Sequence, residues 1–276
     1  MPTLAALVTV YHRIDPAELR ACLASLAAQT RPADEVVIVA DGPLSPPLDA
    51  VLSEFAAQHP EGRGRARIVR CEQNRGAGPA AAAGMAVIDA EWVARLDADD
   101  VAKPERFERQ LAYLAEHPGV DTLGTAVAEF DGTDFDHART ARVLPAAHPD
   151  IVRYAKMNSP VNNPTVMLRR TAVERAGGYR DVHHMEDYDL YARLIASGAR
   201  LHNLPEPLTY FRVNPDQFGR RTGRGMLRAE CQMQRNLVKY GLISWPRAGF
   251  NVVARSVYRA LPQRILQRVY RMLFRL

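Results

Sequence analysis

Trp92-Val-Ala-Arg-Leu-Asp-Ala-Asp-Asp100 joins a short apolar run to three carboxylates. The apolar first half predicts a strand buried in a protein core. Three like charges this close in the chain repel one another unless a cation neutralises them, and carboxylate oxygens suit Mn²⁺ or Mg²⁺. We therefore predict that Asp97, Asp99 and Asp100 bind a divalent metal. The alternative is a solvated acidic turn before a helix that begins near Lys103.

Upstream of this stretch, apolar runs alternate with segments of helical pattern. The apolar runs occupy residues 4–10, 35–40, 67–71 and 92–96, and helices are expected at 15–29, 48–59 and 77–90. Continuous apolar strands separated by helices predict an α/β fold with a Rossmann-like, mostly parallel sheet covered by helices. Ligands of such sheets bind beyond the carboxyl ends of the strands. We therefore expect the polar residues at these ends to meet at one edge: Thr9, Tyr11, Asp41, Asn74, Arg75, Asp97, Asp99 and Asp100.

The rest of the chain is less regular. Strands are expected at 119–130, 165–168, 200–203 and 207–213, a loop at 131–146, and helices at 103–117, before Gly177, and at 186–197, 222–241 and 247–275. This pattern predicts one catalytic domain at residues 1–220, followed by a helical extension at 221–276.

Two of the strand ends carry residues suited to a nucleotide. The Asp41 carboxylate can accept hydrogen bonds from a base imide or a ribose, although Asp41-Gly42 also fits a plain turn. Arg75 precedes an alanine-rich helix, whose N-terminus favours anions, so it can pair with a diphosphate. The glycines at 76 and 78 lack the third glycine of a dinucleotide-binding fingerprint.

A second acidic cluster, Glu186-Asp187-Tyr-Asp189, begins a predicted helix. Acids in a first helical turn complement the helix dipole, which is the simpler interpretation. The functional interpretation is a general base that takes the proton from a sugar hydroxyl. Glycines at 177 and 178 and histidines at 183 and 184 suggest a mobile loop that delivers the base.

The basic character of the chain belongs to its C-terminal tail. The net charge is +5, yet residues 231–276 contain nine Lys and Arg and no Asp or Glu. From Pro262 onward four arginines share one side of a predicted amphipathic helix: Arg264, Arg268, Arg271 and Arg275. We expect residues 247–276 to lie on an anionic membrane surface, or else to pack on the catalytic domain. Nucleic acid is not expected as a partner.

Other features suggest a location. No apolar run of about 18 residues predicts a membrane span, and the first ten residues do not resemble a secretory signal. Three widely spaced cysteines fit a reducing compartment better than a disulfide framework. We therefore expect a cytoplasmic protein, peripheral on the inner face of the cell membrane.

Eight short motifs follow one another in an order that resembles family 2 glycosyltransferases, particularly the bacterial exopolysaccharide and O-antigen branch that includes amylovoran-type enzymes. The resemblance covers roughly residues 3–213. The motifs are Thr9-Val-Tyr11, Gln29-Thr-Arg-Pro32, Val37-Ile-Val-Ala-Asp41-Gly42, Asn74-Arg-Gly76, Asp97-Ala-Asp-Asp100, Asn163-Pro-Thr165, Gly177-Gly-Tyr-Arg180 and Glu186-Asp-Tyr-Asp-Leu190.

The resemblance implies the GT-A fold and a metal-dependent, hexosyltransferase-like reaction that inverts the anomeric centre. It implies a UDP- or dTDP-sugar donor and a lipid-linked saccharide acceptor in cell-surface polysaccharide biosynthesis. The implied donor-binding residues are Thr9, Tyr11, Asp41, Arg75 and Asp97. The implied metal ligands are Asp99, Asp97 and Asp100, with Asp99 the most direct, and the implied catalytic residues are Asp187 as base and Glu186 beside it. Asn163 stands where the family often has His.

Two other functions would use some of the same residues. A sugar nucleotidyltransferase also places carboxylates and metal near a diphosphate, but it normally needs a glycine-rich basic loop that residues 4–13 lack. A catalytically silent nucleotide-binding module at the membrane surface is the second alternative, and the two acidic clusters argue against it.

Overall fold

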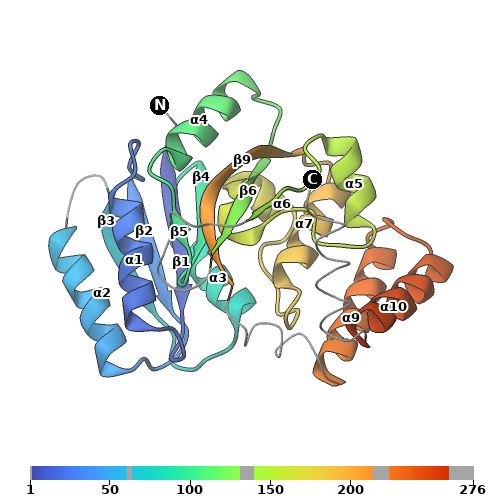
Figure 1. Ribbon diagram of the computed structural model, residues 1–276, viewed down its shortest axis with the longest axis horizontal. Helices are drawn as coiled ribbons and strands as arrows, with labels where there is room; N and C mark the ends of the chain where they lie inside the picture. The colour runs from blue at the N-terminus through green and yellow to red at the C-terminus, as the bar shows by residue number, and fades with distance from the viewer. Residues whose placement is uncertain (1, 61–63, 131–139, 214–223, 261–276) are drawn as a thin grey trace.

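The computed structural model describes residues 2–60, 64–130, 140–213 and 224–260, which form a mixed sheet with helices on both faces (Figure 1). The strands are β1 (Leu4–Val10), β2 (Glu35–Ala40), β3 (Arg65–Arg70), β4 (Trp92–Asp97), β5 (Val101–Ala102), β6 (Thr122–Phe130), β7 (Thr140–Arg142), β8 (Met167–Arg169) and β9 (Leu201–Arg212). In the described part their order is β3-β2-β1-β4-β8-β6-β9-β5, with β7 paired to β6.

The N-terminal half of the sheet is parallel, as the sequence predicts. β1 lies between β2 and β4, and β3 follows β2. The register pairs Thr9 with Val39 on one side and with Asp97 on the other. The polar residues that follow these strands therefore leave the sheet at one edge, which is the arrangement expected for a ligand site.

The other half of the sheet is mixed. β8 is antiparallel to both β4 and β6, whereas β6 and β9 are parallel. β9 is one long strand, where the sequence predicts two short ones, because a register shift between Thr125 and Val127 of β6 accommodates its prolines. The short strands β5 and β7 are additions to the prediction, and β7 lies inside the segment 131–146 that was expected to be a loop.

Helices cover both faces. They are α1 (Pro16–Ala27), α2 (Pro46–Gln58), α3 (Ala77–Met85), α4 (Arg106–Glu116), α5 (His148–Ala155), α6 (Arg170–Arg175), α7 (Glu186–Ala196), α9 (Arg224–Lys239) and α10 (Trp245–Ala260), with a 3₁₀ turn, η1, at Asn163–Thr165. Figure 1 shows α1 and α2 at one end of the molecule and α9 and α10 at the other.

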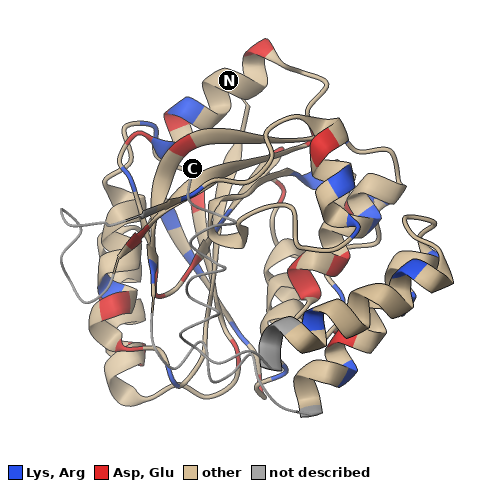
Figure 2. Ribbon diagram, turned by 45° about the vertical axis from the view of Figure 1, so that its right-hand side comes forward, with Lys and Arg blue, Asp and Glu red and all other residues tan. Residues whose placement is uncertain are grey.

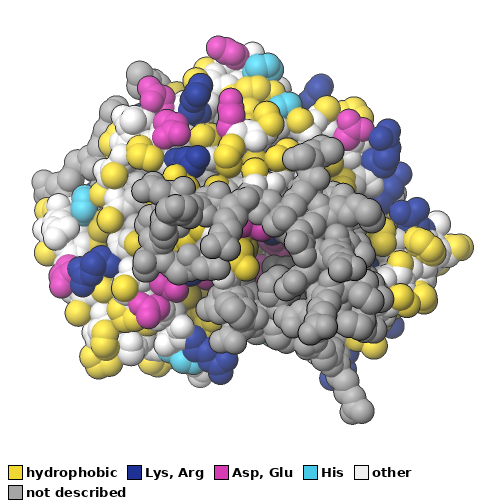
Figure 3. Space-filling view, in the orientation of Figure 1, with side chains coloured by type: hydrophobic (Ala, Val, Ile, Leu, Met, Phe, Trp, Pro, Cys, Tyr) yellow, Lys and Arg dark blue, Asp and Glu magenta, His cyan; other side chains and the backbone are white. Residues whose placement is uncertain are grey.

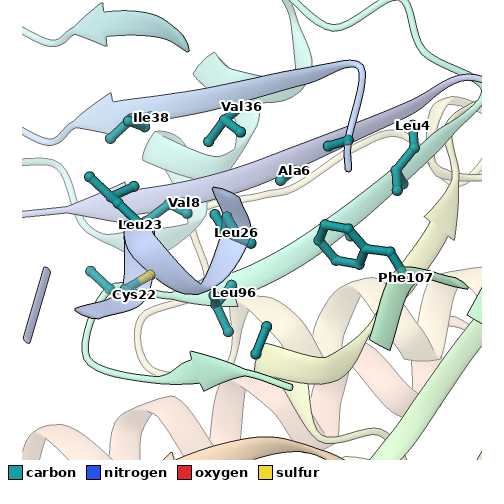
Figure 4. Close-up of a cluster of buried hydrophobic side chains, with 14 of the residues drawn as sticks. Leu4, Ala6, Val8, Cys22, Leu23, Leu26, Val36, Ile38, Leu96 and Phe107 are labelled. Atoms are coloured by element: carbon teal, nitrogen blue, oxygen red, sulfur yellow. The ribbon is translucent and has the colours of Figure 1, made fainter. Parts of the chain in front are cut away.

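One face of the parallel half packs on α1, α2 and α4. Figure 4 shows alternate side chains of β1 and β2 pointing toward Cys22, Leu23 and Leu26 of α1, with Leu96 and Phe107 beside them. The opposite face packs on α3, whose small residues allow a close approach. A Cβ added at Gly84 would lie 2.4 Å from Cδ1 of Leu7. Because α3 lies this close to the sheet, its N-terminus is held at the strand ends.

Some helix boundaries differ from the prediction. α3 ends at Met85 rather than near residue 90, because Val87 and Ile88 turn toward the core cluster under α3. α5 was not predicted, since it has only eight residues and a proline in its first turn. The helix expected at 247–275 begins at Trp245 and is described to Ala260. The predicted arginine face from 264 to 275 lies outside the described residues.

α9 and α10 form a C-terminal hairpin that packs on α7. Met226, Met233 and Leu237 of α9 share a buried cluster with Tyr188 and Ala192 of α7. Within the described part of the chain, no helix combines the length and apolar character needed to cross a membrane.

Candidate active site

Thr9 and Asp97 lie next to each other at the end of the parallel strands, and a buried arginine lies beneath them. Nη2 of Arg95 lies 3.5 Å from Oγ1 of Thr9, to which it donates, and 3.6 Å from Oδ1 of Asp97. Arg95 is 2% exposed, and its Nε and Nη1 have no hydrogen-bond partner among the described residues. A buried guanidinium of this kind provides a fixed positive charge beside the first carboxylate of the acidic turn.

Asp41 connects the end of β2 to the N-terminus of α3. Its two carboxylate oxygens accept hydrogen bonds from the backbone N–H groups of Arg75, at 2.8 Å, and Gly76, at 2.9 Å. Gly42 adopts φ +83°, and a Cβ there would lie 2.5 Å from the backbone nitrogen of Asn74. The Asp41-Gly42 pair therefore fixes the 74–76 turn, a structural contribution that the sequence alone did not indicate.

The same turn lines a cavity. Its volume is about 490 Å³, which lies in the range of small-molecule sites. The lining residues are Asp41, Cys71, Glu72, Gln73, Arg75, Pro79, Ala80 and Ala83. The exposed Arg75 side chain supplies positive charge next to the N-terminus of α3, which suits an anionic group at that end, while the acids Asp41 and Glu72 line the rest of the cavity. Tyr11 is half-buried just beyond β1, at the same strand end.

The three carboxylates at 97–100 have raised pKa values. Burial, with the neighbouring charge of Asp97 next in importance, raises the pKa of Asp99 to about 6. Burial is also the largest cause of the raised pKa of Asp97 and Asp100, and Arg95 opposes it at Asp97. A cation between these groups would favour their ionised forms, so the electrostatics of the turn suit a divalent metal.

The structure separates the contacts of the three carboxylates. Asp100 is 1% exposed, and its Oδ1 accepts the backbone N–H of Arg212 at 2.8 Å. Its Oδ2 has no hydrogen-bond partner among the described residues. Asp97 and Asp99 are more exposed than Asp100. Arg212 also donates from Nε to the carbonyl of Asp99 at 3.0 Å, so the end of β9 holds the acidic turn.

The described residues contain no group of three or more His, Cys, Asp or Glu side chains placed to hold a metal ion. The predicted set of Asp97, Asp99 and Asp100 therefore does not form such a group by itself. In proteins Mg²⁺ is commonly shared between one or two carboxylates and the phosphates of a substrate. The oxygen donors of Asp97 and Asp99 fit Mn²⁺ or Mg²⁺ of this kind.

Glu186 and Asp187 begin α7, and this helix end meets the N-terminus of α3. A Cβ added at Gly78 would lie 2.4 Å from the carbonyl oxygen of Arg180 and 3.1 Å from Cβ of Glu186. Burial, with the charge of Asp187 next in importance, raises the pKa of Glu186 to about 7, and Arg95 opposes this shift. Oδ1 of Asp187 accepts the backbone N–H of Tyr188 at 2.7 Å.

Asn163 links the acidic turn to α7, a role that the sequence alone does not indicate. Its Nδ2 donates to Oδ1 of Asp97 at 3.2 Å, and its Oδ1 accepts the hydroxyl proton of Tyr191 at 3.1 Å. Tyr191 lies one helical turn after Asp187. The signal in the sequence was the Asn-Pro pair of η1, but no spacing rule joins it to residues 66 positions away.

Asp189, the third acid of the second cluster, has a structural role. It is fully buried and pairs with Nε of Arg193 at 2.8 Å. Its Oδ1 accepts hydrogen bonds from Asn236 and Tyr240 of the C-terminal hairpin, both at 2.8 Å. His183 and His184 pack against each other in the preceding loop, where His184 adopts φ 60°.

Contacts therefore connect the predicted site residues across the sheet edge. Asp41 holds the 74–76 turn at the start of α3, Gly78 brings that helix against Glu186, and Asn163 joins Asp97 to α7. These contacts link Asp41, Asp97 and Glu186 through neighbouring elements, whereas of the predicted site residues only Asp41 and Arg75 line the cavity. Arg95 and Asn163 are additions to the set predicted from the sequence.

Comparison with known proteins gives consistent matches. Residues 6–177 match the family model described as glycosyl transferase family 2. The chain is 36% identical to the amylovoran biosynthesis glycosyltransferase AmsE of Erwinia amylovora, over 96% of each protein. It is 27% identical to the UDP-Gal:alpha-D-GlcNAc-diphosphoundecaprenol beta-1,3-galactosyltransferase of Escherichia coli, over 99% of this chain and 97% of that protein.

Solved structures support the fold. TarS 1–349 of S. aureus in complex with UDP-GlcNAc superposes with a TM-score of 0.65 at 16% identity, over 85% of this chain and 66% of that one. The mannosyltransferase PcManGT of Pyrobaculum calidifontis, in complex with GDP-Man and Mn²⁺, gives a TM-score of 0.60 at 19% identity, over 99% of this chain and 80% of that one.

Proposed function

This chain belongs to glycosyl transferase family 2 and has the GT-A fold, and from that premise we propose that it transfers a sugar from a nucleotide diphosphate-sugar to an acceptor hydroxyl, with inversion at the anomeric carbon. The family places it among the enzymes of polysaccharide biosynthesis. The observation that carries the proposal is the meeting of the α3 and α7 N-termini beside the acidic turn, because this brings an anion-binding end and a carboxylate base to one place.

The donor nucleotide occupies the cavity beside the 74–76 turn. Asp41, which lines the cavity, and Tyr11, which follows β1, bind the base and ribose, while Arg75 and the N-terminus of α3 bind the diphosphate. Thr9 and Asp97, held together by Arg95, position the sugar-phosphate end. The donor is a UDP- or dTDP-sugar, a choice supported by the E. coli relative, whose name includes UDP-Gal.

Asp99, assisted by Asp97 and Asp100, holds Mn²⁺ or Mg²⁺. Such a metal supplies positive charge that offsets the charge developing on the departing nucleotide diphosphate. Asp99 is the most direct ligand in this assignment, because Asp100 already accepts a backbone hydrogen bond with one of its oxygens. Arg75 adds positive charge on the same side.

Asp187 is the general base. Its carboxylate takes the proton of the acceptor hydroxyl while that oxygen attacks the anomeric carbon from the face opposite the leaving diphosphate, which inverts the centre. Glu186, whose pKa is about 7, is mostly neutral in slightly acid solution. It therefore adds little negative charge beside Asp187 there. Tyr191 and Asn163 fix α7 relative to Asp97, and so fix the base relative to the donor.

The acceptor is a lipid-linked saccharide. The name of the E. coli relative includes a diphosphoundecaprenol-linked sugar, which supports this choice. We further propose that residues 1–220 form the catalytic domain and that the extension at 221–276 associates with the cytoplasmic face of the cell membrane, residues 247–276 on anionic lipid. The +9 charge of residues 231–276 supports this part of the proposal.

Donor turnover tests the function. The purified chain is incubated with UDP- and dTDP-sugars and lipid-linked or soluble saccharide acceptors, with Mn²⁺ or with EDTA, and released nucleotide diphosphate is measured. We expect turnover with metal, loss in EDTA, and a loss of at least about 100-fold in Asp187→Asn, in line with general-base contributions. Asp150→Asn, an exposed acid on α5, is the matched control.

Full activity in excess chelator would remove the metal assignment, and near-normal turnover in Asp187→Asn would remove the base assignment. Pyrophosphate release from a nucleoside triphosphate and a sugar phosphate would instead indicate a sugar nucleotidyltransferase.

A further inference from the structure

α10 presents large apolar side chains to solvent. Trp245 is 64% exposed, Phe250 60%, Val253 63% and Val257 58%. At about 100° per residue these four lie within an arc of about 140° on one side of the helix, which we call the α10 face. Leu227 of the adjacent α9 is 47% exposed. Contiguous exposed apolar surface on a folded domain marks an interaction site.

The exposed charges on the two helices of the hairpin are basic. Four exposed cationic residues lie on the two helices of the hairpin: Arg228, Arg235, Lys239 and Arg247. The last acid in the sequence, Glu230, is fully buried and pairs with Arg255 at 2.7 Å. Figure 2 shows the Lys and Arg segments along α9 and α10. In Figure 3 hydrophobic and basic side chains lie next to each other at the right-hand edge, where Figure 1 places α10.

We propose that the α10 face docks on the surface of an anionic lipid bilayer, an inference that rests on the proposed transfer to a lipid-linked acceptor. Tryptophan and other apolar side chains on one side of a helix, with Arg and Lys beside them, are typical of helices that lie in the membrane interface. Anionic headgroups attract each basic residue near the surface.

Charge distinguishes this occupant from a second copy of the chain. A twofold contact brings the same surface patch of both copies together. Such a contact would bring the exposed cations of the two hairpins, such as Arg247 beside Phe250, closer to each other, with no carboxylate from residues 231–260 to offset them. An anionic bilayer instead neutralises them.

Docking at this surface would also orient the active site. Asn236 and Tyr240 of α9 hold Asp189 of α7, and Met185, just before Glu186, packs in the same cluster as α9. The helix that carries the proposed base is therefore fixed relative to the α10 face. A lipid-linked acceptor would then meet the base at a constant height above the bilayer.

Tryptophan fluorescence provides a direct test on the full-length chain. The sequence has two tryptophans, and Trp92 is 2% exposed, so a change on adding vesicles reports on Trp245. With vesicles of equal parts phosphatidylcholine and phosphatidylglycerol we expect a blue shift and quenching by brominated lipid. Pure phosphatidylcholine should give a much weaker response. Trp245→Phe should lose the shift and still sediment with the vesicles.

Matched substitutions test whether the face itself makes the contact. We expect Phe250→Glu/Val253→Glu to lower vesicle binding at least about tenfold. Val143→Glu, a similar change at a residue 40% exposed next to β7, should leave binding unchanged. Equal melting temperatures of the variants show that the fold is retained. Sugar transfer to a soluble saccharide acceptor is measured in parallel. If the unchanged protein and all variants fail to transfer sugar, the proposed function is contradicted, whereas the docking is tested by vesicle binding alone.

Three results would overturn the inference. In the first, the double variant binds vesicles as tightly as the unchanged protein, so that other residues make the contact. In the second, the emission of Trp245 does not change although the protein sediments with lipid. In the third, the lipid-free protein is a dimer that the double variant converts to a monomer, so that a second copy occupies the face.

Discussion

Replacing Gly78 by alanine should weaken catalysis more than it weakens the fold. The added Cβ would lie 2.4 Å from the carbonyl oxygen of Arg180, whereas real Cβ contacts are 3.0 Å or longer, so the Arg180 backbone in the loop before α7 must move by about 0.6 Å. Cβ of Glu186, 3.1 Å from the added atom, must also shift slightly. A misplacement of about 1 Å near a reacting group can cost about 100-fold in rate, so we expect kcat to fall roughly tenfold. Overpacking costs about 1–3 kcal/mol, and the gain in helix propensity returns about 1 kcal/mol.

The chain offers a matched control for this substitution. Gly225 is the second residue of α9, as Gly78 is of α3, and a Cβ at Gly225 meets no atom within 4 Å. Gly225→Ala should leave kcat unchanged and stabilise the protein slightly. The assays are donor turnover at saturating substrate and urea unfolding. If Gly78→Ala turned over at the rate of Gly225→Ala, the contact between α3 and α7 would not position the base.

Four further outcomes are expected. The folded protein binds the Glu186 proton more tightly than the unfolded chain, because its pKa is raised from 4.5 to about 7, so metal-free stability should fall as pH rises between these values. Glu186→Gln should remove about 3 kcal/mol of that change in urea titrations, and an unchanged slope would contradict the assignment. Mn²⁺ at about 100 times its dissociation constant should add about 2.7 kcal/mol of stability near neutral pH, and Asp99→Asn should lose this increment in thermal unfolding. Tyr191→Phe leaves the side-chain oxygen Oδ1 of Asn163 without its donor, so the free energy of unfolding should fall by about 1–3 kcal/mol and kcat several-fold. An unaffected kcat would show that the contact is purely structural. Asp189→Asn removes the buried partner of Arg193 and should cost about 3–5 kcal/mol in chemical unfolding, so a loss below about 1 kcal/mol would show that the pair does not anchor the hairpin.

The parallel half of the sheet was predictable because its signals are local. Each apolar run is bounded by turn residues, and the rule that ligands bind at the carboxyl ends of strands predicts Thr9, Asp41 and Asp97 at one edge. The antiparallel position of β8 was not predictable in this way. The three residues of β8 have the apolar pattern of any buried strand. The direction of the strand depends on its pairing with β4 and β6, which are distant in the sequence.

The roles of individual polar residues depend on the same kind of distant contact. Asp99 and Asp100 are neighbours in the chain, yet the backbone of Arg212, 112 positions later, is bound to Asp100. Asp189 reads as part of an acidic first turn, and only the packing of α9 shows it as a buried anchor. The positions of the acidic residues are evident from the sequence. Which of them accepts a backbone hydrogen bond was decided by elements that meet only in three dimensions.

The anchoring of α9 to Asp189 limits how the protein can be shortened or recombined. A version cut after Arg212 would uncover the apolar side chains of α7 that Met226, Met233 and Leu237 protect, and it would leave Asp189 with fewer donors. Such a fragment should aggregate rather than behave as a smaller enzyme. A chimera that exchanges C-terminal halves between relatives must therefore bring compatible partners for position 189, and libraries that vary acceptor preference should keep α7 and α9 from the same parent.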